Sequence, residues 1–119
     1  MACMFTELIV DCINAESVAS FWAAALSWTH TGRYEGAIEI AGPDGSLPSL
    51  VFVTVPERKT AKSRLHIDVN PTDCDQRDEV ARLIALGARE VDIGQHDVPW
   101  VVLADVEGNE FCVLADRRG

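Results

Sequence analysis

The same order of predicted elements, a strand, a helix and then three strands, occurs twice along the 119 residues of this chain. The two copies are offset by about 60 residues, which indicates an internal repeat. Glu7 lies seven residues before the predicted helix cap Asn14, and His66 lies seven residues before the predicted cap Asp73. Each half has one apolar sheet face, and pairing the halves buries both. We therefore expect a single domain, with modules at about 1–60 and about 61–119.

The first half carries the signals of one helix and four strands. Asn14 can cap a helix that runs to about Trp28, and apolar residues recur within it at helical spacing. Runs rich in Ile, Val and Leu, and short segments between turn residues, indicate the strands. These strands are expected at Phe5–Cys12, Arg33–Tyr34, Ala37–Ala41 and Leu50–Val55.

The second half repeats this order with different boundary signals. Asp73 and Gln76, three residues apart, have the spacing of a capping box, and Gly87 is well placed to end the helix. A turn at Glu107–Asn109 joins the last two strands. The strands are expected at Arg64–Val69, Arg89–Ile93, Trp100–Ala104 and Phe111–Ala115.

Composition excludes several classes of partner. The formal charge of -9 argues against nucleic acid, because phosphate binding requires a cationic surface. The basic run from Arg58 to Arg64 is the local exception, and a solvated loop is favoured there over an anion site. No apolar run approaches the roughly 20 residues of a membrane span, and no signal peptide is evident, so a cytoplasmic protein is expected. The four cysteines lack CxxC spacing and are expected to be free thiols.

Four segments carry a family resemblance that covers nearly the whole chain. They are Phe21–Trp28, Leu65–Val69, Leu86–Arg89 and Asp105–Leu114. In this order they resemble a glyoxalase-like domain of the vicinal oxygen chelate superfamily, which includes bleomycin-resistance proteins and extradiol dioxygenases. The resemblance implies an α+β fold of two paired βαβββ modules whose curled mixed sheets form a cleft. A homodimer is expected by analogy. Ser27 replaces the family's usual Gly, and Val106 its usual Pro.

The resemblance also implies a set of metal ligands. Metal-dependent members take four ligands from the first and last strand of each module. By position, the first falls on Glu7, the third on His66 and the fourth on Cys112, where the family usually has Glu. The second should lie within Leu50–Val53, which offers no ligand. Glu110 is expected on the same strand face as Cys112. Glu7, His66 and Cys112 are therefore the candidate ligands of a divalent metal (Zn, Mn, Ni or Fe), and a protein without metal stays open.

Each candidate site residue also has a purely structural interpretation. His66 can ligate a metal or move protons, or it can be a cleft histidine hydrogen-bonded to Asp68. Glu7, the second candidate catalytic residue, can face the cleft or solvent. Cys112 can be a ligand or a small core residue. Trp100 is the best candidate for stacking on a ligand. Phe52 and Phe111 complete the candidate substrate-binding set.

Two main functional hypotheses follow, and a third is less specific. The first is a metal-free protein that binds a small, partly apolar molecule in a cleft lined by Glu7, His66 and aromatic residues, as bleomycin-resistance proteins do. The alternative is a divalent-metal-dependent lyase, isomerase or dioxygenase acting on vicinal oxygens of a small substrate. The third is an accessory domain without a small-molecule role. Metal content separates the second hypothesis from the others, and stabilisation by a ligand separates the first from the third.

Overall fold

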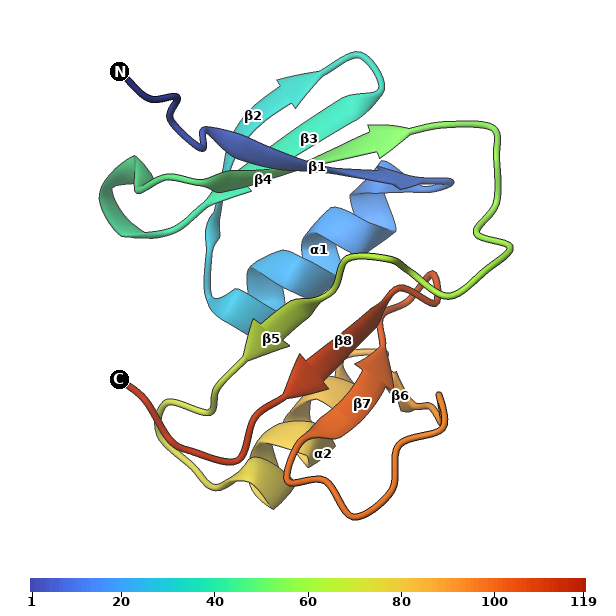
Figure 1. Ribbon diagram of the computed structural model, residues 1–119. Coiled ribbons are helices and arrows are strands. Elements are labelled where there is room, and N and C mark those ends of the chain that lie inside the picture. Colours follow the sequence, from blue (N-terminus) through green and yellow to red (C-terminus); the bar gives the residue numbers. More distant parts are fainter. The chain divides into compact units, whose positions relative to one another are not determined.

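The computed structural model describes all of residues 1–119, and the chain divides into two compact units, Met1–Arg58 and Lys59–Gly119. Each unit has its own helix and its own four-stranded sheet (Figure 1). Neither helix is long and apolar enough to cross a bilayer.

The first unit has a mixed sheet in the order β1-β4-β3-β2, with one helix against it. Strand β1 runs parallel to β4, whereas β4, β3 and β2 are antiparallel neighbours. A short 3-10 turn at Pro43–Gly45 precedes the last strand. The elements are β1 (Glu7–Cys12), α1 (Ala15–Leu26), β2 (Thr29–Tyr34), β3 (Ala37–Ala41) and β4 (Ser49–Thr54).

Helix α1 begins where the sequence predicts and ends two residues early. The Asn14 side chain accepts a hydrogen bond from the Ser17 backbone N–H at 3.1 Å, which satisfies one of the free donors of the first turn. At the other end Ser27 takes a left-handed conformation, with φ 56°, so the helix stops before Trp28. Phe21 and Trp22 are both buried on the helix face that packs on the sheet.

The second unit repeats the topology of the first, with the sheet order β5-β8-β7-β6. Strand β5 is parallel to β8, and the other neighbours are antiparallel. Two βαβββ modules with four-stranded mixed sheets confirm the predicted α+β fold class. The elements are β5 (Ile67–Val69), α2 (Gln76–Ala85), β6 (Arg89–Glu90), β7 (Val101–Ala104) and β8 (Glu110–Val113).

Several element boundaries differ from the prediction for local reasons. The cap of α2 is Asp75, which accepts from the Asp78 N–H at 2.9 Å; the predicted cap Asp73 lies outside the helix. Strand β6 ends at Glu90 instead of Ile93. The Val91 N–H still donates to the Val102 carbonyl, but the Ile93 and Gly94 N–H groups donate to the side chains of Gln95 and Asp92, at 2.8 and 2.7 Å. Strand β2 begins earlier than predicted, at Thr29, and contains a register shift.

The hairpin between β7 and β8 is organised by one buried carboxylate. Asp105, at 1% exposure, accepts hydrogen bonds from the backbone N–H groups of Glu107 and Asn109 at 2.9 and 3.0 Å. The Asn109 side-chain amide donates to the same carboxylate. The turn predicted at Glu107–Asn109 is confirmed, and Asp105 fixes the register with which β8 returns beside β7.

Candidate ligand pocket and metal-binding group

Two parallel strands of the second unit place three potential metal ligands together. Strand β5 begins at Ile67 and not at Arg64 as predicted, so His66 lies immediately before it. The His66 imidazole and the Asp68 carboxylate, two residues apart, still lie on one side of this segment, with Nε2 and Oδ1 in contact. The β5–β8 register pairs Asp68 with Cys112. Because Phe111 belongs to the buried face that α2 covers, Cys112 lies on the opposite, open face.

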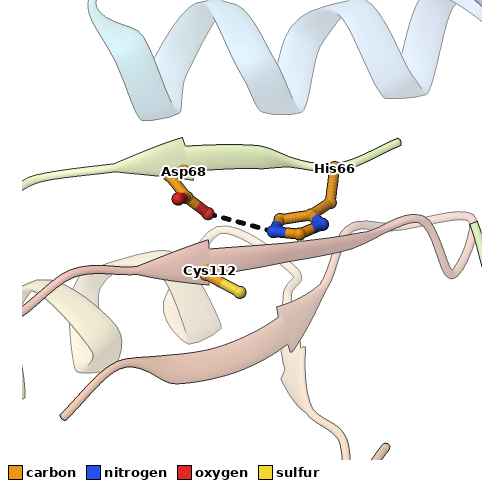
Figure 2. A group of neighbouring side chains, drawn as sticks. All are labelled: His66, Asp68 and Cys112. Carbon is orange, nitrogen blue, oxygen red and sulfur yellow. Dashed lines mark ion pairs between the residues drawn. The ribbon is translucent and has the colours of Figure 1, made fainter. Parts of the chain in front are cut away.

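The donor atoms of His66, Asp68 and Cys112 all lie within 4.8 Å of one another. His66 Nε2 is 3.2 Å from Asp68 Oδ1. Figure 2 shows the imidazole and the carboxylate side by side along β5, with the thiol on the neighbouring strand β8. The His66 and Asp68 side chains are 45% and 48% exposed, whereas Cys112 is only 6% exposed. The group is therefore open on its imidazole and carboxylate side and closed at the thiol.

The environment of Cys112 keeps its thiol protonated in the absence of a metal. Burial raises the pKa of the Cys112 thiol, and the negative charge of Asp68 and a hydrogen bond to that carboxylate raise it further. The positive charge of Lys62 acts in the opposite direction but does not reverse the shift. Without a cation, Cys112 is thus a weak nucleophile and a small apolar residue.

A pocket of ≈ 460 Å³ opens directly above this group. This volume lies within the range of about 300–1,000 Å³ that is usual for small-molecule sites. Trp100 contributes a large aromatic surface and is 40% exposed. The polar and apolar groups therefore face the same space. The lining residues are His66, Asp68, Ile93, Gly94, Gln95, Trp100, Cys112 and Leu114.

The wall that carries Trp100 is held in place by Gln76, the first residue of α2. Its side-chain amide donates to the carbonyl oxygens of Pro99, at 2.8 Å, and Val113, at 3.0 Å. These bonds tie the loop before β7 both to the helix and to the end of β8. The sequence suggested only a capping role for Gln76, and its link to Pro99 spans 23 residues, for which no local signal exists.

The segment that leads into His66 is held by Glu110 on β8. Glu110 accepts from Lys59 Nζ at 2.8 Å and from the Ser63 backbone N–H at 2.7 Å. Burial raises the pKa of the Glu110 carboxyl, but the hydrogen bonds from Lys59 and Ser63 outweigh it and lower the pKa to about 2. Lys59, in the basic run of the sequence, therefore forms a structural ion pair within this unit.

The other predicted site residues lie away from this group or in the other unit. Glu7 begins β1 of the first unit, where it is exposed and in register with Ser49; its role as a ligand or catalytic group stays a prediction. Phe52 is fully buried in the core of the first unit. Phe111 is 1% exposed and faces away from Cys112, and neither Phe lines the pocket. Their contact with a substrate stays a prediction.

The structure adds Asp68 to the candidate ligands. The sequence analysis considered it only as a hydrogen-bond partner of His66, and that pairing is present. The signal that could have identified it as a ligand is the His-x-Asp spacing where the chain enters a strand, because extended backbone places residues two apart on one face.

The three residues fit a divalent cation. Zinc bonds of about 2.0–2.3 Å place tetrahedral ligands roughly 3.3–3.8 Å apart. The His66 and Asp68 atoms already approach this spacing, and no pair in the group is further apart than 4.8 Å. Imidazole, carboxylate and thiolate are all ligands that zinc accepts in proteins.

Similarity to a known protein family extends over nearly the whole chain. A family model described as a glyoxalase-like domain matches residues 7–114. No curated protein matches the sequence.

Three solved structures illustrate the similarity in fold. A glyoxalase/bleomycin resistance protein/dioxygenase family enzyme from Burkholderia phytofirmans PsJN is 13% identical, with a TM-score of 0.68 over 93% of this chain and 97% of the other. A possible glyoxalase from Bacillus cereus is 16% identical, with a TM-score of 0.68 over 96% and 100% of the two chains. A mutant of the fosfomycin resistance protein FosX from Listeria monocytogenes, complexed with Mn(II) and 1S,2S-dihydroxypropylphosphonic acid, is 9% identical, with a TM-score of 0.73 over 97% and 90%. At these identities the similarity establishes a shared fold.

Proposed function

The chain belongs to the glyoxalase-like domain family of the vicinal oxygen chelate superfamily, and on this basis we propose that it binds a small molecule in the pocket beside His66. One observation carries the proposal: a pocket of ≈ 460 Å³ in which the polar group His66, Asp68 and Cys112 faces the indole of Trp100. Apolar walls with a few convergent polar groups are typical of small-molecule sites.

The lining indicates the chemistry of the ligand. Trp100 offers a face for stacking on a flat or apolar group, and Ile93 and Leu114 extend the apolar wall. Asp68 and His66 can exchange hydrogen bonds with hydroxyl, carbonyl or amine groups at the opposite side. A partly apolar molecule with a polar group at one end satisfies both walls.

A thermal-shift screen of metal-free protein tests this proposal. The compounds are dicarbonyls, catechols, thiol adducts and small aromatic cations, and a ligand raises the melting temperature by binding only the folded state. Trp100→Ala is expected to abolish the shift of each true ligand. Tyr34→Ala is the matched control, because Tyr34 is an exposed aromatic residue of the first unit that does not line this pocket. Hits that are insensitive to Trp100→Ala contradict the proposed site.

A second candidate function is supported by the spacing of the three donor atoms. In this form the protein is a divalent-metal-dependent lyase, isomerase or dioxygenase, and the ion (Zn, Mn, Ni or Fe) is held by His66 and Cys112 together with Asp68 or Glu7. Such an ion, when bound, polarises substrate oxygens as a Lewis acid. A carboxylate not bound to the ion, Glu7 in particular, accepts or returns a proton. The Mn(II) complex of FosX supports a metal on this fold.

Self-association and location complete the proposal. We expect a homodimer, supported by exposed apolar side chains such as Phe5, Ile9 and Leu65, which a second copy can cover. Four free cysteines support residence in the reducing cytoplasm. Sedimentation equilibrium tests the dimer, and a monomer at micromolar concentration contradicts it.

A further inference from the structure

We propose that His66, Asp68 and Cys112 form a zinc site contained within the second unit, with no ligand required from Glu7. This inference rests on the metal-dependent form of the proposed function and specifies its ion and its ligands.

The backbone of two adjacent strands already fixes the ligand positions. His66 lies immediately before β5 and its imidazole contacts Asp68 within that strand, and the register of the parallel pair sets Cys112 beside Asp68. No second unit is needed to bring these donors within 4.8 Å. Asp68 and Cys112 lie within strands, and ligands on strands are held more precisely than ligands on loops.

The thiolate determines which ion is preferred. Cys112 supplies the one sulfur donor of the group. Soft thiolate ligands favour zinc and imidazole also suits it, whereas oxygen ligands suit harder ions such as manganese. One imidazole, one carboxylate and one thiolate, with a fourth position open, form the ligand count of a catalytic zinc site.

The open position determines what the zinc can bind. His66 and Asp68 are about half exposed, so the free side of the ion faces the pocket and not the buried strand face. The indole of Trp100 and the side chain of Ile93 border the same space. The ligand class is therefore a molecule whose oxygen donor reaches the zinc while its apolar body lies against Trp100.

Metal titrations of the full-length, tag-free apoprotein test the proposal without any substrate. Zinc is expected to bind at one ion per chain, measured by competition with a chromophoric chelator. Cobalt is expected to give a near-ultraviolet thiolate-to-cobalt charge-transfer band. Each of the variants His66→Ala, Asp68→Ala and Cys112→Ser should weaken zinc binding by at least about 100-fold, since even outer-shell changes cost 10–100-fold.

Four further variants make the result specific. Cys74→Ser and Cys3→Ser remove thiols outside the group and are expected to leave the zinc affinity unchanged. Cys112→Glu should abolish the charge-transfer band and shift the preference from zinc towards manganese. Glu7→Gln tests the single-unit claim and is expected to leave the zinc affinity within twofold, about 0.4 kcal/mol.

The outcomes separate this inference from the proposed function. Absence of stoichiometric zinc, or a cobalt spectrum without the charge-transfer band, overturns the inference. Loss of zinc in Glu7→Gln also overturns it and assigns a ligand set drawn from both units. Ligands that stabilise the metal-free protein through Trp100 keep the small-molecule function even if zinc fails. Stoichiometric zinc without any ligand keeps the inference and removes the binding function.

Discussion

Replacing Glu110 with Gln should destabilise the second unit, because this carboxylate holds the segment that precedes His66. The Glu110 side chain is only 13% exposed and accepts from Lys59 Nζ and from the Ser63 backbone N–H. Glutamine keeps one acceptor oxygen for Ser63 but presents no negative charge to Lys59. It therefore mimics the protonated acid and leaves a partly buried ammonium group without its counter-charge.

The size of this loss of stability follows from the pKa of Glu110. A folded-state pKa of about 2, against an ordinary value of 4.5, corresponds to about 3 kcal/mol at roughly 1.4 kcal/mol per pKa unit. The folded-state pKa is depressed, so this stabilisation is fully present above pH 4.5 and is lost as the pH falls towards 2. The free energy of unfolding of Glu110→Gln should therefore be lower than that of the parent protein by about 3 kcal/mol at pH 7 and by about 1.5 kcal/mol at pH 3.

Urea unfolding at several pH values measures this difference, with hydrogen exchange of residues 59–66 reporting on the segment itself. Arg33→Gln is the matched control, because the Arg33–Glu16 pair is exposed on both sides and its loss should not change the urea midpoint measurably. In Lys59→Met, the further change Glu110→Gln should cost much less than it does in the parent. If Glu110→Gln lowers the free energy of unfolding at pH 7 by less than about 0.5 kcal/mol, or by an amount that does not shrink on acidification, the reasoning is refuted.

Three further changes have expected outcomes. Ser27→Gly should raise the free energy of unfolding by about 0.5–1 kcal/mol, because Ser27 holds a left-handed φ of 56° that glycine adopts without strain. A lower free energy of unfolding, measured by urea denaturation, contradicts this. Asp105→Ala should lower it by about 2–3 kcal/mol, because the N–H groups of Glu107 and Asn109 lose their buried acceptor; a change within 0.5 kcal/mol, measured by the same unfolding, contradicts this role. Gln76→Ala should speed hydrogen exchange in the loop before Trp100 and weaken ligand binding while leaving the zinc affinity unchanged; unchanged loop exchange contradicts the positioning role.

The fold was predictable from the sequence because its signals are local and occur twice. Asn14 caps α1 as expected, since its side chain reaches a donor only three residues away. The predicted cap of α2, Asp73, lies two residues before the actual cap, Asp75, because both residues are chemically suitable. The interaction that occupies Gln76 runs to Pro99 and Val113 and cannot be seen from neighbouring residues.

The site was predictable only in part, because its residues come together through contacts that are distant in the sequence. His66 and Cys112 came from the family resemblance, and their proximity follows from a strand register that pairs Asp68 with Cys112 across 44 positions of the chain. The ion pair of Lys59 and Glu110 joins residues 51 apart, so the basic run gave no sign of it. Phe111 was considered for substrate contact because it is aromatic, but strand alternation turns it into the core.

The most direct test of small-molecule binding beside His66 is to map a bound compound onto individual residues. Backbone and indole N–H resonances are recorded by nuclear magnetic resonance during titration with each compound that raises the melting temperature. The proposed function predicts that the largest shifts occur at Trp100, at Gly94 and Gln95, and at the residues around His66 and Cys112. Shifts confined to the first unit, or none at saturating compound, would contradict a ligand site in this pocket.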